Sequence, residues 1–557
     1  MNRMKGFLLC ALSLVCAIGA SAQSTEWLWA NKAGGMYYDQ GQVIATDITG
    51  NCYVAGFFCD VSSFGTTSLT SSGERDIFVA KLNSDGNWLW AVKAGGQLED
   101  RSFGLAIDSL GNCYIAGYFM NTATFGNTTL SCHGVYDIFI AKLDTNGNWL
   151  WAKRAGGISQ EYCSGIALDD SANIYMTGGF RYTASFGNTS LDSDDGDFDV
   201  FVAKLDTNGN WLWAVRAGGA NNDLGSSIAL DNSANVYITG DFLETAEFGS
   251  TSLTSFGGQD IFIAKLDLNG NWLWSTHAGS MYDDQGYGIS VGNSANVYLT
   301  GHFKDTAAFG TTSLTSSGSD DIFVSKLDSY GNWLWSVKAG GTSTDYGYCT
   351  AVDSFDNITL SGFFHNTAYF GTVSLICQEH SDCFVAKLDT NGNWLGAASA
   401  VGYSDCGYGI TVDSASNVYL IGLFFKTTLF GSIALTADWD GDVSTYYPDI
   451  FIAKLTMGET ANQDPTIPDL SALSNLSDAY PNPNRRGETV IIKANIAERE
   501  SGTLTIFNLR GQCVAVHQLS PGEQQITLDN RKLPAGIYLY KLKTRDKCIS
   551  KKLVVIK

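Results

Sequence analysis

"NGNWLWAVRAGG", residues 208–219, is one of seven related stretches in a chain of 557 residues. The first Trp of these stretches falls at residues 27, 88, 149, 211, 272, 333 and 394, so the repeating unit is 61 or 62 residues long. Three other features keep the same step: an Asn that opens a β-rich run, a Phe-Gly pair and an Asp-x-Phe triplet. A fixed period of this length indicates a repeat fold in which each unit buries its apolar faces against its neighbours.

The third unit shows how each unit divides into four short strands. "GIALD" (165–169) and "NIYMTG" (173–178) are joined by a polar turn, and "DVFVAKL" (199–205) leads through "DTNGN" (206–210) into the Trp strand. Asn-Gly between two apolar runs is a strong hairpin signal, and no stretch of the unit has a helical period. These units predict an all-β fold, a seven-bladed β-propeller over residues 23–455.

The two ends of the repeat region predict how the ring closes. The first copy, "STEWLWANKAGG" (24–35), has no strand before it, and the last unit ends at "DIFIAKL" (449–455) with no Trp strand after it. We therefore expect the N-terminal strand to complete the last blade, which removes two exposed sheet edges. A right-handed β-helix is the alternative repeat fold, but its coils are shorter and would not need a split unit.

The repeat also resembles a known family. The stretches "AKLDTNGNWLWAKRAGG" (141–157) and "GIALDDSANIYMTGGF" (165–180) are similar to the seven-bladed propeller repeat of large secreted bacterial proteins. The resemblance implies the fold and leaves the ligand open. The sixth unit departs from the pattern, because Gly396 stands where its second Trp is expected.

The N-terminal residues 1–22 have the pattern of a secretory signal peptide. Arg3 and Lys5 precede an apolar run, and Ala20-Ser21-Ala22 forms a small-x-small cleavage site. No later segment is long and apolar enough to cross a membrane. The net charge of −22 argues against nucleic acid or anionic lipid as a partner, since both need a basic surface. Among the 13 cysteines, Cys377 and Cys383 flank a short segment and are candidates for a disulfide.

Beyond a polar linker, residues 456–478, the chain ends in a basic segment that predicts a small β-sandwich, residues 479–557. It closely resembles the C-terminal sorting domain of type IX secretion cargo in Bacteroidetes-like bacteria. The residues that carry the resemblance are "YPNP" (480–483), Gly511 in "NLRGQ" and "LPAGIYLYKL" (533–542). The resemblance implies the type IX secretion machinery as partner and a secreted or outer cell-surface protein that passes through the periplasm.

An acidic column is the first candidate for ligand binding. One acid lies in the connection from the Trp strand to the first strand of the next unit, often among aromatic residues, and a ring of such acids could bind a cation or a polyhydroxy ligand. The alternative is that each acid caps its own turn. The column consists of Asp39, Asp100, Glu161, Asp223, Asp284, Asp345 and Asp405.

Two irregular loops are candidates for calcium, a hard cation that prefers oxygen ligands. Neither loop matches the EF-hand pattern, and acidic surface turns are common. The inserted loop of the seventh unit also holds Trp439, a candidate for stacking on a sugar face or, alternatively, for covering the rim of the blade. The acids are Asp192, Asp194, Asp195 and Asp197 in the third unit, and Asp438, Asp440 and Asp442 in the seventh.

The repeated Trp and Lys columns are interpreted as framework, with a repeated Asp as the partner of each Lys. The sequence shows no zinc spacing, nucleophile elbow or phosphate-binding loop, so no cofactor is certain and calcium is the one candidate. Three hypotheses follow. The leading one is a non-catalytic surface or secreted module that binds a glycan, peptide or matrix component; the others are a glycan-active hydrolase or lyase with a loop-built carboxylate site, and a structural spacer.

Overall fold

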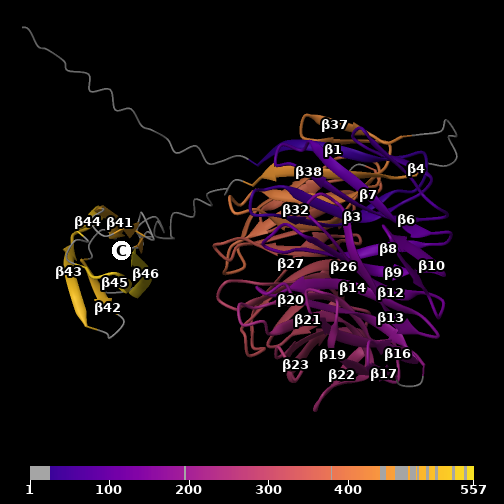
Figure 1. The fold of residues 1–557 in the computed structure, drawn as a ribbon, viewed down its shortest axis with the longest axis horizontal. Coiled ribbons are helices and arrows are strands. Elements are labelled where there is room, and N and C mark those ends of the chain that lie inside the picture. Colours follow the sequence, from indigo (N-terminus) through magenta and orange to yellow (C-terminus); the bar gives the residue numbers. More distant parts are fainter. Residues whose placement is uncertain are drawn as a thin grey trace, which may run out of the picture. The chain divides into compact units, whose positions relative to one another are not determined.

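The computed structural model describes residues 25–457, apart from 194–195, 378 and 439–446, and the strands of residues 475–556 with part of their connections. Every regular element in these residues is a β-strand, so the all-β prediction is confirmed, and the repeat body is propeller-like (Figure 1). The chain divides into two compact units, residues 1–461 and 462–557. The predicted signal peptide lies outside the described residues.

Four strands of each repeat pair antiparallel in chain order, and we name them A, B, C and D. The A strands are β2 (Gln40–Thr46), β8 (Asp100–Ile107), β14 (Glu161–Leu168), β20 (Leu224–Leu230), β24 (Gln285–Val291), β28 (Tyr346–Val352) and β34 (Cys406–Val412). The B strands are β3 (Cys52–Phe58), β9 (Cys113–Phe119), β15 (Ile174–Arg181), β21 (Val236–Phe248), β25 (Val297–Phe309), β29 (Ile358–Phe364) and β35 (Val418–Phe424). The C strands are β6 (Asp76–Leu82), β12 (Asp137–Leu143), β18 (Phe198–Leu205), β22 (Thr251–Leu266), β26 (Thr312–Leu327), β32 (Asp382–Leu388) and β38 (Asp449–Thr456). The D strands are β7 (Trp88–Gly96), β13 (Trp149–Gly157), β19 (Trp211–Gly219), β23 (Trp272–Gly279), β27 (Trp333–Gly341), β33 (Trp394–Ser399) and, from the N-terminus, β1 (Glu26–Gly35).

Each repeat also holds a hairpin between strands B and C, which the four-strand prediction missed. The Phe-Gly pair forms its tip: Phe64 meets the Trp88 ring edge-on at 5.6 Å, and Gly65 has a φ of 63°. A Cβ on Gly65 would lie 2.6 Å from Trp88, so only glycine fits this turn. The separate hairpins are β4 (Val61–Phe64) with β5 (Thr67–Thr70), β10 (Thr122–Phe125) with β11 (Thr128–Ser131), β16 (Thr183–Phe186) with β17 (Thr189–Asp192), β30 (Thr367–Phe370) with β31 (Val373–Ile376), and β36 (Thr427–Phe430) with β37 (Ile433–Thr436); in repeats four and five the hairpin continues strands B and C.

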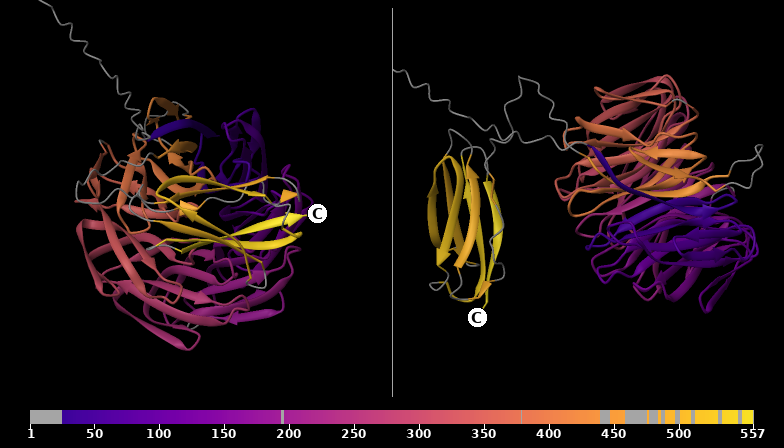
Figure 2. Two further views of the ribbon diagram at one scale, coloured as in Figure 1. Left: turned by 90° about the vertical axis from the view of Figure 1, so that its left-hand side faces the viewer. Right: turned by 90° about the horizontal axis from the view of Figure 1, so that it is seen from above.

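The N-terminal strand pairs with the last repeat. β1 runs antiparallel to β38, from Glu26 opposite Thr456 to Ala33 opposite Ile450, and Figure 1 shows the indigo β1 beside the orange β38. The colours pass through the repeat body in sequence order, so that the first and last repeats meet (Figure 2). One apolar cluster joins Val54 and Phe78 of the first repeat to Tyr419 and Ile452 of the last.

The Trp and Lys columns connect neighbouring repeats, as the framework interpretation expected. Nε1 of Trp90 donates to the Thr145 carbonyl, 3.1 Å away, in the turn between strands C and D of the next repeat. In the Lys column, Nζ of Lys81 donates to Oγ1 of the same Thr145 at 3.3 Å, and it also lies 3.7 Å from Oδ2 of Asp47, which directly follows strand A of its own repeat. The Trp side chains of this column are half-buried.

Repeat six deviates because its neighbour has no turn between strands C and D. Strand D of the last repeat is β1, so no C–D turn is available there for an indole to reach, and Gly396 occupies the indole position. Lys387 instead moves closer to its own Asp353, at 3.1 Å, whereas the corresponding separations in five other repeats are 3.7–3.9 Å. The departure in the sequence thus follows from the pairing of the two ends.

The cysteine prediction is wrong. Cys377 and Cys383 are both buried, and both have free thiols. The other cysteines in the described residues for which a state is assigned are also free. Both lie in well-packed apolar surroundings, Cys377 against the sixth repeat and Cys383 beside Val385 and Phe451. The body has a sufficient core without a covalent link.

The C-terminal unit has two sheets on one core, as the sandwich prediction expected. Val490, Leu504, Tyr540 and Leu553 meet between the sheets. One sheet has the order β39 (Asn475–Leu476), β41 (Thr489–Ile496), β44 (Gly522–Asp529), and the other β40 (Asn484–Arg485), β46 (Cys548–Ile556), β45 (Gly536–Lys543), β42 (Gly502–Asn508), β43 (Cys513–Leu519).

Candidate functional site

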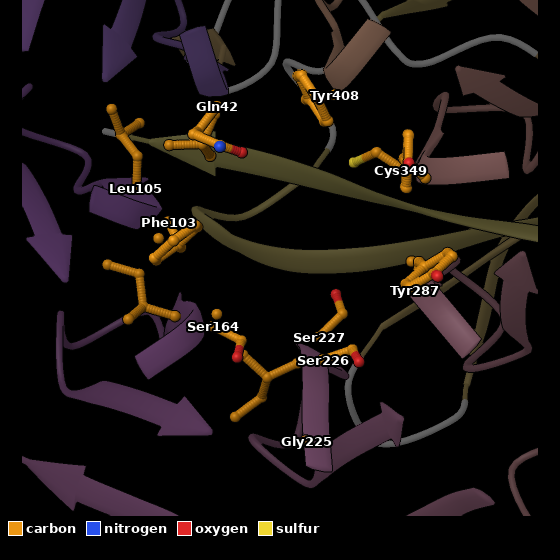
Figure 3. Close-up of a pocket in the computed structure, with 18 of the residues that line it drawn as sticks. Gln42, Phe103, Leu105, Ser164, Gly225, Ser226, Ser227, Tyr287, Cys349 and Tyr408 are labelled. Carbon is orange, nitrogen blue, oxygen red and sulfur yellow. The ribbon is translucent and has the colours of Figure 1, made fainter. Parts of the chain in front are cut away.

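The seven A strands surround one cavity of about 490 Å³. Each A strand contacts the next in chain order, and β34 contacts β2. All seven contribute to the lining, so every repeat presents side chains to the same space. Figure 3 shows these side chains around the cavity.

A β-bulge in every A strand determines which residue faces the cavity. The register shifts by one residue at the same point of each strand, for example between Gly225 and Ser227 of β20. The extra residue has no partner across the ladder, and a bulge of this kind re-aims the side chain. The bulge residues, which we call the bulge column, are Gln42, Phe103, Ser164, Ser226, Tyr287, Tyr348 and Tyr408, and all seven line the cavity.

The bulge column divides the cavity wall into two chemical sectors. Tyr287, Tyr348 and Tyr408 follow one another around the wall, with ring centroids 5.2 and 5.3 Å apart. Burial raises the pKa of all three phenols, so they remain neutral donors at physiological pH. The second sector, which we call the serine sector, holds Ser164 on β14 and Ser226 on β20 (Figure 3).

Asp241 is the acidic residue of the cavity lining. It is buried at the end of the short run that pairs β21 with β20, opposite Leu224. Burial, with a smaller contribution from Asp283, raises the pKa of Asp241 to about 7. Its Oδ2 has no hydrogen-bond partner among the described residues. A carboxyl of this kind can act as an acid or accept a ligand proton near neutral pH.

His302 occupies on β25 the position that Asp241 has on β21. Its ring stacks on Tyr346 at 4.0 Å, and burial lowers the pKa of His302 to about 4. Its Nδ1 lacks a partner within the described part of the chain. Asp241 in the cavity lining and His302 at the equivalent position of the next repeat are therefore two buried polar groups with an unpartnered atom among the described residues.

The acidic column lies at the start of strand A, where its carboxylates brace the chain. Oδ2 of Asp100 accepts the Gly96 N–H at 2.7 Å, and Oδ1 accepts the Met120 N–H at 3.1 Å. The same 2.7 Å contact recurs from Gly219 to Asp223 and from Gly341 to Asp345. All seven acids are completely buried: Asp39, Asp100, Glu161, Asp223, Asp284, Asp345 and Asp405. This geometry favours the turn-bracing alternative; direct contact with a ligand remains a prediction.

The loop candidates lie partly outside the described residues. Trp439, Asp440, Asp442, Asp194 and Asp195 are not described. Oδ1 of Asp197 pairs with Arg181 at 3.1 Å, Oδ1 of Asp438 pairs with Lys32 at 2.5 Å, and Asp192 accepts a hydrogen bond from Thr183. In the part of the chain that the structure describes, no three His, Cys, Asp or Glu side chains are grouped as metal ligands, so calcium binding remains a prediction.

The sequence contained a signal for the bulge column that sequence reasoning missed. The bulge column varies from repeat to repeat, while the framework columns of Trp, Lys and Asp recur. Variation was expected in the loops instead, because simple alternation along a strand does not reveal a bulge residue.

The comparisons with known proteins agree with this architecture. Residues 478–557 match the family model of the secretion system C-terminal sorting domain. An uncharacterized WD repeat-containing protein of Acanthamoeba polyphaga mimivirus is 23% identical over 500 residues, which cover 71% of this chain and 36% of that protein. The chain thus spans about a third of that relative's length.

Two of the solved structures similar to this chain are the following. A polysaccharide lyase of family PL25, an ulvan lyase, is 11% identical with a TM-score of 0.39, covering 70% of this chain and 93% of its own. YCF48 bound to the D1 peptide is 8% identical with a TM-score of 0.34, covering 79% and 99%.

The C-terminal sorting domain identifies the route by which this protein is exported. The chain is a propeller-like repeat protein that the type IX secretion machinery exports to the cell surface or to the outside. No helix in the described residues is long and apolar enough to cross a membrane.

Proposed function

We propose that the seven repeats form the seven blades of a β-propeller and that β1 closes the ring. The contacts of β34 with β2 and the apolar cluster shared by the first and last repeats support this arrangement. We also propose residues 23–455 as the propeller, 456–478 as the linker and 479–557 as the sorting domain. The end of β38 at Thr456 and the boundary of the first compact unit at Ala461 support the end of the propeller, whereas the pairing of β39 with β41 extends the C-terminal sheet into the last residues of this linker.

We propose that the protein is a non-catalytic, exported binding module that holds a glycan in the cavity between the A strands. The observation that carries this proposal is the bulge column: framework positions recur from repeat to repeat, whereas the seven residues aimed into the cavity are of four types, three Tyr, two Ser, one Gln and one Phe. A symmetric spacer would have no physical reason to present chemically different side chains to one shared cavity. Tyrosine rings can stack on sugar faces, while serine and glutamine side chains exchange hydrogen bonds with sugar hydroxyls.

A glycan-array screen of the mature chain, followed by calorimetry on the best ligand, tests the proposal. We expect Tyr348→Ala to weaken binding at least tenfold, because the ring lies between two other tyrosines of the wall. Tyr330→Ala is the matched control, since Tyr330 is 80% exposed in a turn between strands C and D. Equal loss in both variants, or binding by neither the parent nor the variants, would contradict the proposal; the second result favours a spacer, and binding of peptides alone favours a peptide partner.

Asp241 supports a second candidate function, a glycan-active hydrolase or lyase. A buried carboxyl with a pKa of about 7 at the ligand cavity has the property that a general acid needs. Asp241→Asn separates the two functions. An enzyme would lose turnover of its glycan and keep binding it, whereas a binding module shows no turnover in either form.

A further inference from the structure

Arg75 and Arg101 lie outside the repeated pattern of charges. Most cations of the body belong to the Lys column on strand C or to a second column on strand D, where Lys93, for example, pairs with Asp76 at 2.9 Å. Arg75 precedes Asp76, at a position where the other repeats have Tyr136, Phe198, Gln259, Asp320, Ser381 and Pro448. Arg101 belongs to neither column. Residues that break a repeat are the ones that can discriminate between ligands.

The two guanidinium groups converge on one acid and one aromatic ring. Nη1 of Arg75 lies 3.1 Å from Oε2 of Glu99, and Arg101 pairs with the other oxygen, Oε1. The Cζ atoms of Arg101 and Arg75 lie 4.6 and 5.5 Å from the centroid of Phe57, on which Tyr38 stacks at 6.0 Å. We call these five residues the arginine corner. With two guanidiniums and one carboxylate, the corner keeps one positive charge.

The arginine corner lies beside the candidate site. Arg101 follows the buried acid of its strand, and the residues at the same position of β14 and β24, Tyr162 and Gln285, line the cavity. Phe103, two residues after Arg101, also lines it. By register, Arg101 therefore lies at the mouth of the cavity.

Both guanidiniums are accessible to a ligand. The side chains of Arg75 and Arg101 are 29% and 25% exposed. A second cleft of about 530 Å³ opens beside Arg75 and Tyr38, and its lining also includes the exposed acids Asp60 and Glu74. Each guanidinium carries five N–H donors, so those that Glu99 does not engage can hold another anion.

We propose that the arginine corner binds the anionic group, a carboxylate or a sulfate ester, of an acidic saccharide whose uncharged part occupies the cavity. This inference rests on the proposed glycan-binding function. Guanidinium forks match carboxylate and sulfate oxygens, and the contacts with Glu99 and Phe57 hold both forks in place before a ligand arrives. On a chain with a net charge of −22, only such a local cationic site attracts an anion.

A saccharide fits the adjoining wall better than an acidic peptide does. The wall offers tyrosine rings, serine hydroxyls and an amide, which suit the faces and hydroxyls of sugar rings. The peptide becomes an outcome of the test.

Calorimetry of the full mature chain with matched oligosaccharides tests the inference. The probes are oligogalacturonate with its methyl ester, and a sulfated galactan oligosaccharide with its desulfated form, so that the two pairs distinguish carboxylate from sulfate. We expect the charged member of one pair to bind at least tenfold more tightly. The Arg75→Gln/Arg101→Gln double variant should lose this difference and keep its affinity for the neutral member.

Arg181→Gln is the matched control: Arg181 also lies over an aromatic ring, Phe198 at 5.0 Å, but in the described part of the chain no second arginine shares that ring. It should keep the preference. A measurement without variants guards against misfolding: raising the salt concentration should weaken binding of the charged member and leave the neutral one unchanged.

The outcomes separate the inference from the proposed function. Equal binding of charged and neutral members overturns the inference and leaves the proposed function intact. The inference is also overturned if the preference for the charged member persists in the double variant, or if it does not change with salt concentration. If no saccharide binds, both fail; if a polyglutamate peptide binds instead, with the same dependence on the two arginines, the acidic saccharide is the wrong ligand.

Discussion

The buried acid at the start of strand A combines two opposing effects. Asp100 accepts two backbone N–H groups, which stabilise its ionised form, but burial outweighs them and raises the pKa of Asp100 to about 8. The pKa values of Asp39, Asp223 and Asp405 are likewise raised to about 8 by burial. The folded protein therefore binds protons that the unfolded chain has already released at pH 5 to 7.

This difference predicts that the free energy of unfolding falls as the pH rises. A carboxyl whose folded pKa exceeds its unfolded value of 3.8 contributes stability below pH 4 that is lost progressively up to about pH 8. Urea unfolding at pH 5, 6, 7 and 8 should show midpoints that decrease, with a smaller decrease in Asp100→Asn. Parent and variant midpoints that change in parallel would contradict the assignment.

The two half-buried indoles of strand D have unequal partners in different repeats. Trp335 donates to the Thr390 carbonyl of the next repeat at 3.1 Å, so Trp335→Ala should lower the free energy of unfolding by about 2–3 kcal/mol, less than for a fully buried Trp. Gly396→Trp should bring no gain, because the site is buried and its neighbour has no C–D turn to accept the N–H. Urea midpoints measure both changes; a stabilised Gly396→Trp would show that another acceptor exists.

At the scale of the element, the sequence predicted the features that recur in every repeat. Strands A to D, the Asn-Gly turns and the roles of the Trp and Lys columns follow from positions that repeat in register. The hairpin at the Phe-Gly pair escaped prediction because its strands are four residues long and pair partly with a D strand of the preceding repeat, through contacts such as Gly95 with Thr124. The bulge column escaped because one inserted residue changes which face a side chain occupies.

Removing β1 is the element-level test of closure. Without Glu26–Gly35, β38 loses its partner along one edge and two half-buried indoles leave the last repeat. We expect the thermal midpoint to fall by at least ~5 °C. A synthetic peptide of residues 24–37 added in trans should restore part of the loss, and an unchanged midpoint would contradict the closed ring.

At the scale of the whole molecule, the two compact units have different roles. The repeat body holds the cavity, while the C-terminal unit matches the sorting domain. A chain lacking residues 462–557 should fold and stay in the periplasm of a host with the type IX machinery. Immunoblots of periplasm, outer membrane and medium measure this, with Tyr348→Ala as a full-length control that should be exported. Efficient export of the truncated chain would contradict the assignment.

The pairing of β1 with β38 also determines how the body responds to a mechanical load. A pull transmitted from the C-terminal side enters the body at Thr456, the last residue of β38. Because β1 supplies the outer strand, β38 lies between β35 and β1 and has hydrogen bonds along both edges. A force along its axis loads both ladders in shear, all at once, whereas an outermost strand would be peeled off one bond at a time. Drag on a protein held by this end therefore acts on the most firmly anchored type of strand in the sheet.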